Sequence, residues 1–187
     1  RPERMRTPLE MVGHPLALCQ GVAMARQYGR TSAFDQESHA CPVGAVIMGH
    51  YDKGPLEAGV ATCPGYVADR EAAYRMEQGI AKLPLHSVKE VWLAPMERAP
   101  FDPDLAIVYG TPAQMARMIH GANYETGEGV ASNGFGRGAC GSYIAQCYLS
   151  QKCTLVVPSG GERIFALTQD HEMMMAVPAV KMASMAR

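Results

Sequence analysis

The sequence lacks the features that would place the chain in a membrane or on nucleic acid. No apolar run approaches the ~20 residues that a membrane-spanning helix needs. Lys and Arg number 17 against 18 Asp and Glu, which gives a formal net charge of −1. A chain without basic excess or charge blocks has no electrostatic footprint for nucleic acid or a membrane surface. The first residues also form no apolar signal segment, so we expect a cytoplasmic protein.

No internal repeat, low-complexity tract or long linker divides the 187 residues. A chain of this length buries a sizeable core without disulfides, and about 100–200 residues is usual for one domain. We therefore expect a single domain over residues 1–187. The chain does not begin with Met, which predicts a shortened N-terminus.

The order of the predicted elements indicates an α/β or α+β fold, with a mixed sheet flanked by helices. The clearest part is Leu105–Tyr109, a short apolar strand, followed by Thr111, Pro112 and Gln114, which form a capping box with Pro in the first turn. A helix should follow from Pro112 to Asn123. The other predicted helices are 15–29, 66–82, 139–150 and 171–187, and the other predicted strands are 88–93, 128–133, 153–157 and 164–167. The run 41–49 is apolar, and its periodicity does not decide between strand and short helix.

The six cysteines lack the paired spacing of familiar metal sites. No two are arranged as C-x-x-C, which excludes a simple zinc ribbon or a thioredoxin-type site. The chain is neither short nor visibly secreted, so free thiols or metal ligands are expected rather than disulfides. Buried cysteines that pack as small apolar residues are the alternative. The six are Cys19, Cys41, Cys63, Cys140, Cys147 and Cys153.

Several segments together resemble the uncharacterised ArCR family, domain of unknown function 169. The similarity extends from about residue 14 to residue 182. It rests on Phe101–Tyr109 with Pro112-Ala113-Gln114, on Leu18-Cys19-Gln20 with Ala25-Arg26, on Cys41-Pro42-Val43-Gly44-Ala45, on Ala139-Cys140, and on Gly161-Glu162-Arg163 with Glu172 and Pro178.

The resemblance implies that Cys19, Cys41 and Cys140 are family positions. Thiolates are soft ligands that suit iron–sulfur clusters, zinc and Cu(I), so these three cysteines are the candidate metal ligands. The chain departs from the family pattern in two places. Family members usually begin with another strand, and they often carry a Cys where this chain has Ser159. A non-thiolate ligand would then replace the fourth cysteine, or the site is altered.

A glycine-rich segment over 134–141 precedes the predicted helix 139–150. Gly136, Gly138 and Gly141 formally match a dinucleotide fingerprint, but the strand before them is poorly defined, and no acidic residue about 20 positions further on ends a clear second strand. These glycines and Arg137 could instead bind a small anion at a helix N-terminus. Cys140 would there have a lowered thiol pKa. A tight turn that needs several glycines is the structural alternative.

Three functions follow from these features. The first is an accessory or redox protein that holds an iron–sulfur cluster or another thiolate-bound metal. The second is a small-anion-binding protein or thiol enzyme that uses the segment 134–141. The third is a structural or partner-binding subunit with inert cysteines. The sequence does not decide whether the chain is an enzyme, and it leaves a redox or enzyme partner and a homo-oligomer open.

Overall fold

The fold is described from a computed structural model, over residues 15–52 and 63–185. Its helices are α1 (Leu18–Tyr28), α2 (Pro42–Ile47), α4 (Cys63–Tyr66), α5 (Arg70–Gly79), α6 (Pro112–Asn123), α7 (Gln146–Ser150), α8 (Gly160–Phe165) and α9 (Ala179–Met185), with the 3-10 turn η2 (Met96–Arg98) and the π-helix η3 (Gly141–Ala145). Its strands are β1 (Ser32–Phe34), β2 (Val91–Leu93), β3 (Leu105–Gly110), β4 (Ala131–Ser132), β5 (Thr154–Val156) and β6 (Met173–Pro178). No helix in these ranges has the length and apolar character to cross a membrane.

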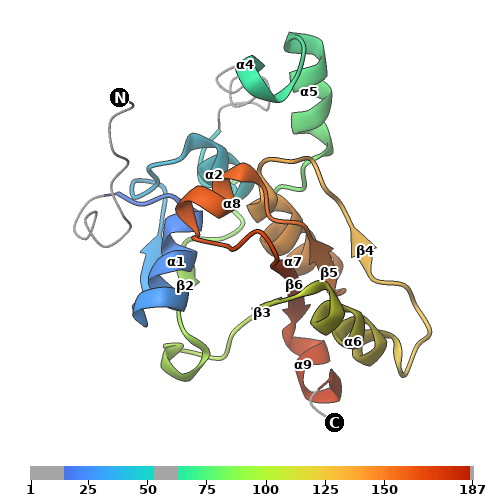
Figure 1. Ribbon diagram of the computed structural model, residues 1–187. Coiled ribbons are helices and arrows are strands. Elements are labelled where there is room, and N and C mark those ends of the chain that lie inside the picture. The colour runs from blue at the N-terminus through green and yellow to red at the C-terminus, as the bar shows by residue number, and fades with distance from the viewer. Residues whose placement is uncertain (1–14, 53–62, 186–187) are drawn as a thin grey trace.

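A mixed sheet of four strands, in the order β3-β6-β5-β4, forms the centre of the molecule (Figure 1). β6 runs antiparallel to both neighbours, and its register with β3 extends from Leu105 opposite Pro178 to Gly110 opposite Met173. β4 is parallel to β5. A second sheet pairs β1 with β2. The predicted α+β class, with a mixed sheet flanked by helices, is therefore confirmed.

β6 is covered on both faces, and its side chains alternate between two hydrophobic clusters. Met174 and Ala176 belong to the larger cluster, with residues of η3 and α7. Met175 and Val177 belong to the smaller one, with Met115 of α6. Successive strand side chains point to opposite faces, so a strand buried on both faces needs apolar residues at every position. The sequence of β6 meets that requirement.

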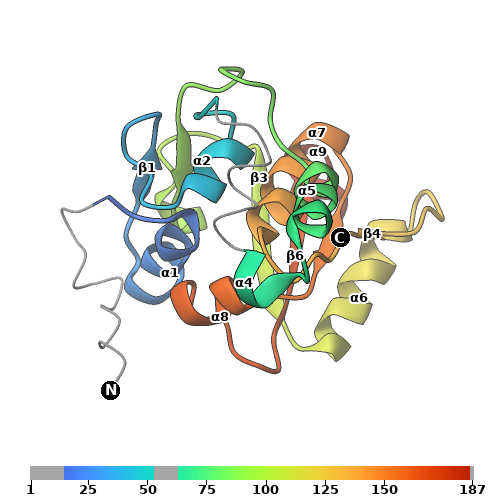
Figure 2. The same ribbon diagram turned by 90° about the horizontal axis from the view of Figure 1, so that it is seen from above.

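The two-stranded sheet and α1 pack together beside the larger sheet. Viewed from above, α1, α2 and β1 gather on one side of β3 and β6 (Figure 2). The close approach of α1 depends on Gly21, because a methyl group there would lie 2.7 Å from the ring of Phe34 and 3.0 Å from Leu93. This packing fixes the side of α1 that faces the larger sheet.

The predictions around Thr111 are confirmed. Residues 105–110 form β3, and α6 begins at Pro112 and ends at Asn123. The Thr111 hydroxyl accepts a hydrogen bond from the Gln114 N–H at 3.4 Å, and the Gln114 side-chain oxygen accepts one from the Thr111 N–H at 2.8 Å. β3 is partly rather than fully buried, because it lies at the edge of the sheet.

The structure decides the alternative left open for the run 41–49, and it corrects two predictions in the C-terminal half. The run 41–49 contains a helix, α2, and not a strand. The predicted last strand at 164–167 is wrong, because Gly160–Phe165 is helical. The predicted helix over 171–187 is also wrong in its first half, which is the strand β6. Burial between two layers of helices outweighs the helix propensity of three consecutive Met residues.

Two helical glycines, one in α1 and one in α6, offer a test of this packing. Gly21→Ala should lower the free energy of unfolding, by about 1–3 kcal/mol, because the added methyl group overlaps the Phe34 ring. Gly121→Ala in α6 meets nothing within 4 Å. It should raise stability by up to about 1 kcal/mol through helix propensity. Urea unfolding of both variants measures the difference, and equal effects would contradict the packing of α1.

Candidate functional site

Each of the four family positions stands at the beginning of a helical element. Cys19 is the second residue of α1, Cys41 directly precedes α2, Cys140 directly precedes η3, and Ser159 directly precedes α8. These elements come from distant parts of the sequence, so the fold alone can bring the four positions near one another.

The three candidate thiols share one electrostatic neighbourhood. Burial raises the pKa of Cys140 well above its ordinary value, and the charges of Glu162, Cys41 and Cys19 raise it further. Burial likewise raises the pKa of Cys19 to about 12, with added effects from Glu162 and Cys41. The segments that carry these thiols are in contact. The Ala40 N–H, next to Cys41, donates to the Leu16 carbonyl oxygen at 2.9 Å, and Leu18, next to Cys19, packs in the same hydrophobic cluster as Cys140.

A carboxyl group, Glu162, and the hydroxyl of Ser159 lie next to each other in this neighbourhood. Both are buried, at 4% and 6% exposure. The Ser159 hydroxyl donates a hydrogen bond to the Glu162 carboxylate. Burial raises the pKa of Glu162. The side chain that replaces the usual family cysteine is therefore tied to a carboxyl group that itself acts on Cys19 and Cys140.

Two tyrosine hydroxyls extend the site, and no sequence motif pointed to them. Tyr143, in η3, is fully buried, and Tyr109 is the fifth residue of β3. Neither hydroxyl has a hydrogen-bond partner among the described residues. The pKa of Tyr143 is raised by burial and by the charges of Glu162, Cys140, Tyr109 and Cys19. A buried hydroxyl without a partner lowers the stability of the folded chain by about 1–3 kcal/mol. A ligand that accepts hydrogen bonds from both phenols would recover this free energy.

Nearby backbone N–H groups act in the opposite direction on two of the thiols. The backbone of Gly141 lowers the pKa of Cys140, and the backbone of Gln20 lowers that of Cys19. These effects are smaller than those of burial and of the neighbouring acidic groups. Such N–H groups favour a thiolate once something compensates its charge.

The site is not arranged for a single metal ion. Within residues 15–52 and 63–185, no three His, Cys, Asp or Glu side chains are grouped closely enough to hold one. The thiols therefore share a neighbourhood without meeting at one point. The prediction that their sulfur atoms approach a common cofactor stays a prediction.

The lowered pKa that a helix N-terminus predicts for Cys140 is wrong. Cys140 does precede a helical element, but its side chain is only 8% exposed. Burial and the nearby acidic groups raise its pKa instead. Desolvation of a thiolate outweighs the favourable helix-terminal field, which is worth about 0.3–1 kcal/mol.

The segment 134–141 is explained by packing at three of its four candidate positions. The Arg137 guanidinium pairs with the Glu77 carboxylate at 2.5 Å, and both side chains are buried. A methyl group on Gly141 would lie 2.4 Å from Ile80, and one on Gly138 would lie 3.1 Å from it. Gly136 has a φ of 70° and open space around it. Arg137 is thus already neutralised, which weakens the case for a bound anion there.

Of the remaining cysteines, Cys153 packs in the smaller hydrophobic cluster, whereas Cys147 packs in the larger one with Cys140. Cys147 is fully buried, and the charge that raises its pKa besides burial is that of Cys153. Cys153 packs in the smaller hydrophobic cluster, with its sulfur 3.7 Å from that of Met185. The side chain of Cys63 lies outside the described residues. Cys19, Cys41, Cys140, Cys147 and Cys153 are all free thiols.

The comparisons with known proteins agree with the motifs. The model of the uncharacterised ArCR family, domain of unknown function 169, matches residues 1–187. The chain belongs to this family. It is similar to the uncharacterised protein MJ0308 of Methanocaldococcus jannaschii, with 26% identity over 170 residues that cover 88% of this chain and 72% of that protein. No solved structure matches at a significant level.

The raised thiol pKa values predict a loss of stability in alkali, which Cys147 can test. Its pKa is about 12 in the folded chain and about 8.5 in an unfolded one. The folded chain therefore keeps a proton that the unfolded chain loses, and this stabilisation declines as the pH rises above about 8.5. Cys147→Ser should flatten that decline by at most about 1.4 kcal/mol per pH unit. It should also lower stability at neutral pH, because its hydroxyl lies in a packed core.

Urea unfolding under reductant at pH 7, 9 and 10 measures both effects. Lys152→Gln serves as the control, because it changes an exposed ion pair with Glu128 and no thiol. A Cys147→Ser protein that has the same pH dependence as the parent would contradict the assignment.

Proposed function

We propose that this chain is an accessory or redox protein that holds an iron–sulfur cluster, or another thiolate-bound metal, at Cys19, Cys41 and Cys140. One set of contacts carries the proposal: the Ala40 N–H donates to the Leu16 carbonyl oxygen at 2.9 Å, beside Cys41 and Cys19, and Leu18 packs in the same hydrophobic cluster as Cys140. Free thiols persist in reducing compartments, so we place this function in the cytoplasm.

The spread of the thiols favours a cluster over a single ion. A single ion requires its ligands to converge on one point, and the described residues offer no such group. An iron–sulfur cluster contains several irons, and its thiolate ligands are distributed among them. Three thiols that share a region without converging suit that case better. Glu162 and Ser159 are then the oxygen-bearing side chains at the position where the fourth thiolate is usual.

The two tyrosine hydroxyls without partners among the described residues favour a bound cofactor whose atoms accept hydrogen bonds. Sulfide and thiolate sulfur atoms accept hydrogen bonds, and such bonds are among the features that set the reduction potential of a cluster. Tyr109 and Tyr143 have hydroxyls without partners, and Tyr143 acts electrostatically on the same thiols. The cluster would also supply positive metal ions to a site whose acidic groups otherwise oppose one another's ionisation.

Anaerobic reconstitution with ferrous iron and sulfide tests the proposal. We expect a visible sulfide-to-iron chromophore and bound iron and sulfide in the parent chain. Cys41→Ser and Cys140→Ser should lose most of both, because a hydroxyl is a poor ligand for these clusters. Cys140→Ser should also lower stability, because Cys140 packs in the same hydrophobic cluster as Cys147, so thermal melts confirm that the variant is folded before its iron and sulfide are measured. Cys153→Ser, in the other hydrophobic cluster, should bind normally.

Equal iron and sulfide in the parent and in Cys140→Ser would contradict the site. The absence of any chromophore would contradict the iron–sulfur form. Titrations with zinc and Cu(I) under the same conditions then test the broader thiolate-metal form. If no metal binds, the alternative of a structural subunit with inert cysteines gains support.

Ser159→Cys provides a second and independent test. It should add a fourth thiol beside Glu162 and slow the loss of iron to a chelator, because four thiolates are the usual ligand set of a cluster. Ser150→Cys adds the same number of thiols at the end of α7 and is the matched control. We would measure the rate at which the visible absorbance decays in the presence of a chelator. Identical rates in the two variants would show that position 159 does not face the cofactor.

A further inference from the structure

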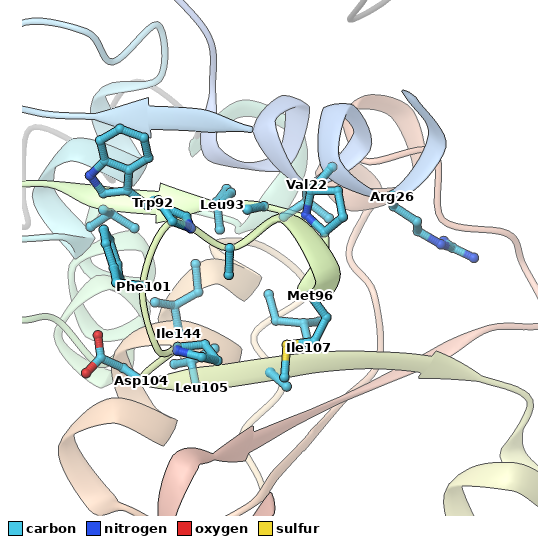
Figure 3. A pocket seen from close by; sticks show the side chains of 18 of the residues that line it. Val22, Arg26, Trp92, Leu93, Met96, Phe101, Asp104, Leu105, Ile107 and Ile144 are labelled. Carbon is cyan, nitrogen blue, oxygen red and sulfur yellow. The ribbon is translucent and has the colours of Figure 1, made fainter. Parts of the chain in front are cut away.

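A cavity of about 790 Å³ lies between the edges of the two sheets. β2 and β3 form its two long sides, and the segment that joins them closes one end (Figure 3). Eight consecutive residues, Glu90–Glu97, and seven consecutive residues, Pro103–Tyr109, line it. Cavities of about 300–1,000 Å³ accommodate small organic molecules, so its size is that of a ligand site.

The middle of the cavity is apolar. Val22 of α1, Leu93 of β2, Leu105 and Ile107 of β3 and Ile144 of η3 surround it (Figure 3). These side chains come from four separate elements, so the cavity is a feature of the packed fold. A hydrocarbon or ring that fills it would be favoured by about 25 cal/mol for each Å² of apolar surface removed from water.

One end of the cavity is aromatic and acidic. The rings of Trp92 and Phe101 meet edge to face with centroids 6.0 Å apart. Asp104 lies at the same end in Figure 3. The Glu90 carboxylate accepts a hydrogen bond from the Trp92 indole N–H at 2.9 Å. Trp92 and Phe101 are 40% and 55% exposed, so their rings are accessible to a ligand.

The opposite end holds a cation that is already neutralised. The Arg26 guanidinium lies 4.2 Å from the centre of the Tyr109 ring and pairs with the Glu172 carboxylate. The charged side chains among the lining residues are Arg26, Glu90, Glu97 and Asp104. Once Arg26 is paired with Glu172, the remaining lining charge is negative.

We propose that this cavity binds a small molecule with an apolar body and a terminal ammonium group. The body would lie along Val22, Leu93 and Ile107. The cation would lie against the rings of Trp92 and Phe101, near Asp104, because ring faces and carboxylates both attract an ammonium ion. This site uses none of the three candidate cysteines, so it goes beyond the proposed cofactor function and does not depend on it.

Trp92 is the single tryptophan of the chain, so its fluorescence reports directly on this end of the cavity. The probes are n-octyltrimethylammonium, n-octanoate and n-octanol, each below the concentration at which it forms micelles. They share one apolar chain and differ in head-group charge. We expect saturable binding of the ammonium probe, at least about threefold tighter than either of the others. Calorimetric titration of the same pairs records binding that leaves the fluorescence unchanged.

Two variants locate the binding. Asp104→Asn should weaken the ammonium probe at least about threefold and leave octanol unchanged, because it removes one charge at the aromatic end. Ala25→Leu extends a side chain on α1 into the cavity and should weaken all three probes. Glu128→Gln changes an exposed ion pair with Lys152 and should alter none of them.

Each possible result of these titrations either supports the proposal or overturns it. Tighter octanoate binding, equal binding of all three probes, or no saturable binding by either method would overturn the proposal. Binding that Ala25→Leu leaves intact would place the probes on the surface, and would overturn it as well. Cys140→Ser should bind the ammonium probe normally, so a failed cofactor reconstitution and a failed cavity are distinguishable.

Discussion

The burial of β6 between two layers of helices is the constraint on which the rest of the fold depends. Because both faces are covered, Met174 and Ala176 join one hydrophobic cluster and Met175 and Val177 join the other. β3 and β5 take their registers from this strand. The position of Tyr109 at the edge of the sheet, opposite Met174, is set by the same pairing.

α1 connects the two proposed sites. Its first turn carries Cys19 toward the acidic neighbourhood, while Val22 and Arg26, one and two turns further, line the cavity. Tyr109 also belongs to both sites. It lines the cavity, and its pKa is raised by burial and by the charges of Glu162 and Cys19. A movement of α1 would therefore alter both sites together, although neither needs the other in order to bind.

The sequence predicts correctly those elements that are specified by short, local patterns of residues. The capping box at Thr111 and the apolar run before it placed β3 and α6 correctly. β6 could not be found in this way, because its continuous apolar run reflects two packing partners distant in the sequence. The helix over Gly160–Phe165 was missed for a related reason: it is short and is held by its surroundings.

The candidate site also contains residues that the sequence predicts and residues that it does not. Cys19, Cys41 and Cys140 could be named through a family pattern, and Ser159 through a departure from it. Glu162 lay within that pattern, but nothing in the sequence indicated its influence on the thiols. The direction of the Cys140 pKa could not be predicted either. It depends on how deeply the thiol is buried, which is a property of the whole fold.

The π-helix η3 explains why two cysteines seven residues apart have different surroundings. In an α-helix, residues at that separation share a face. A π-segment bonds residue i to residue i+5 and so takes more residues for each turn. Gly141–Ala145 lies between Cys140 and Cys147, and it changes the rotational phase of everything that follows. Besides burial, the charges that raise the pKa of Cys140 are those of Glu162, Cys41 and Cys19, whereas the charge that raises the pKa of Cys147 is that of Cys153. The π-segment therefore gives two cysteines of one helical stretch different charged neighbours, although both pack in the larger hydrophobic cluster.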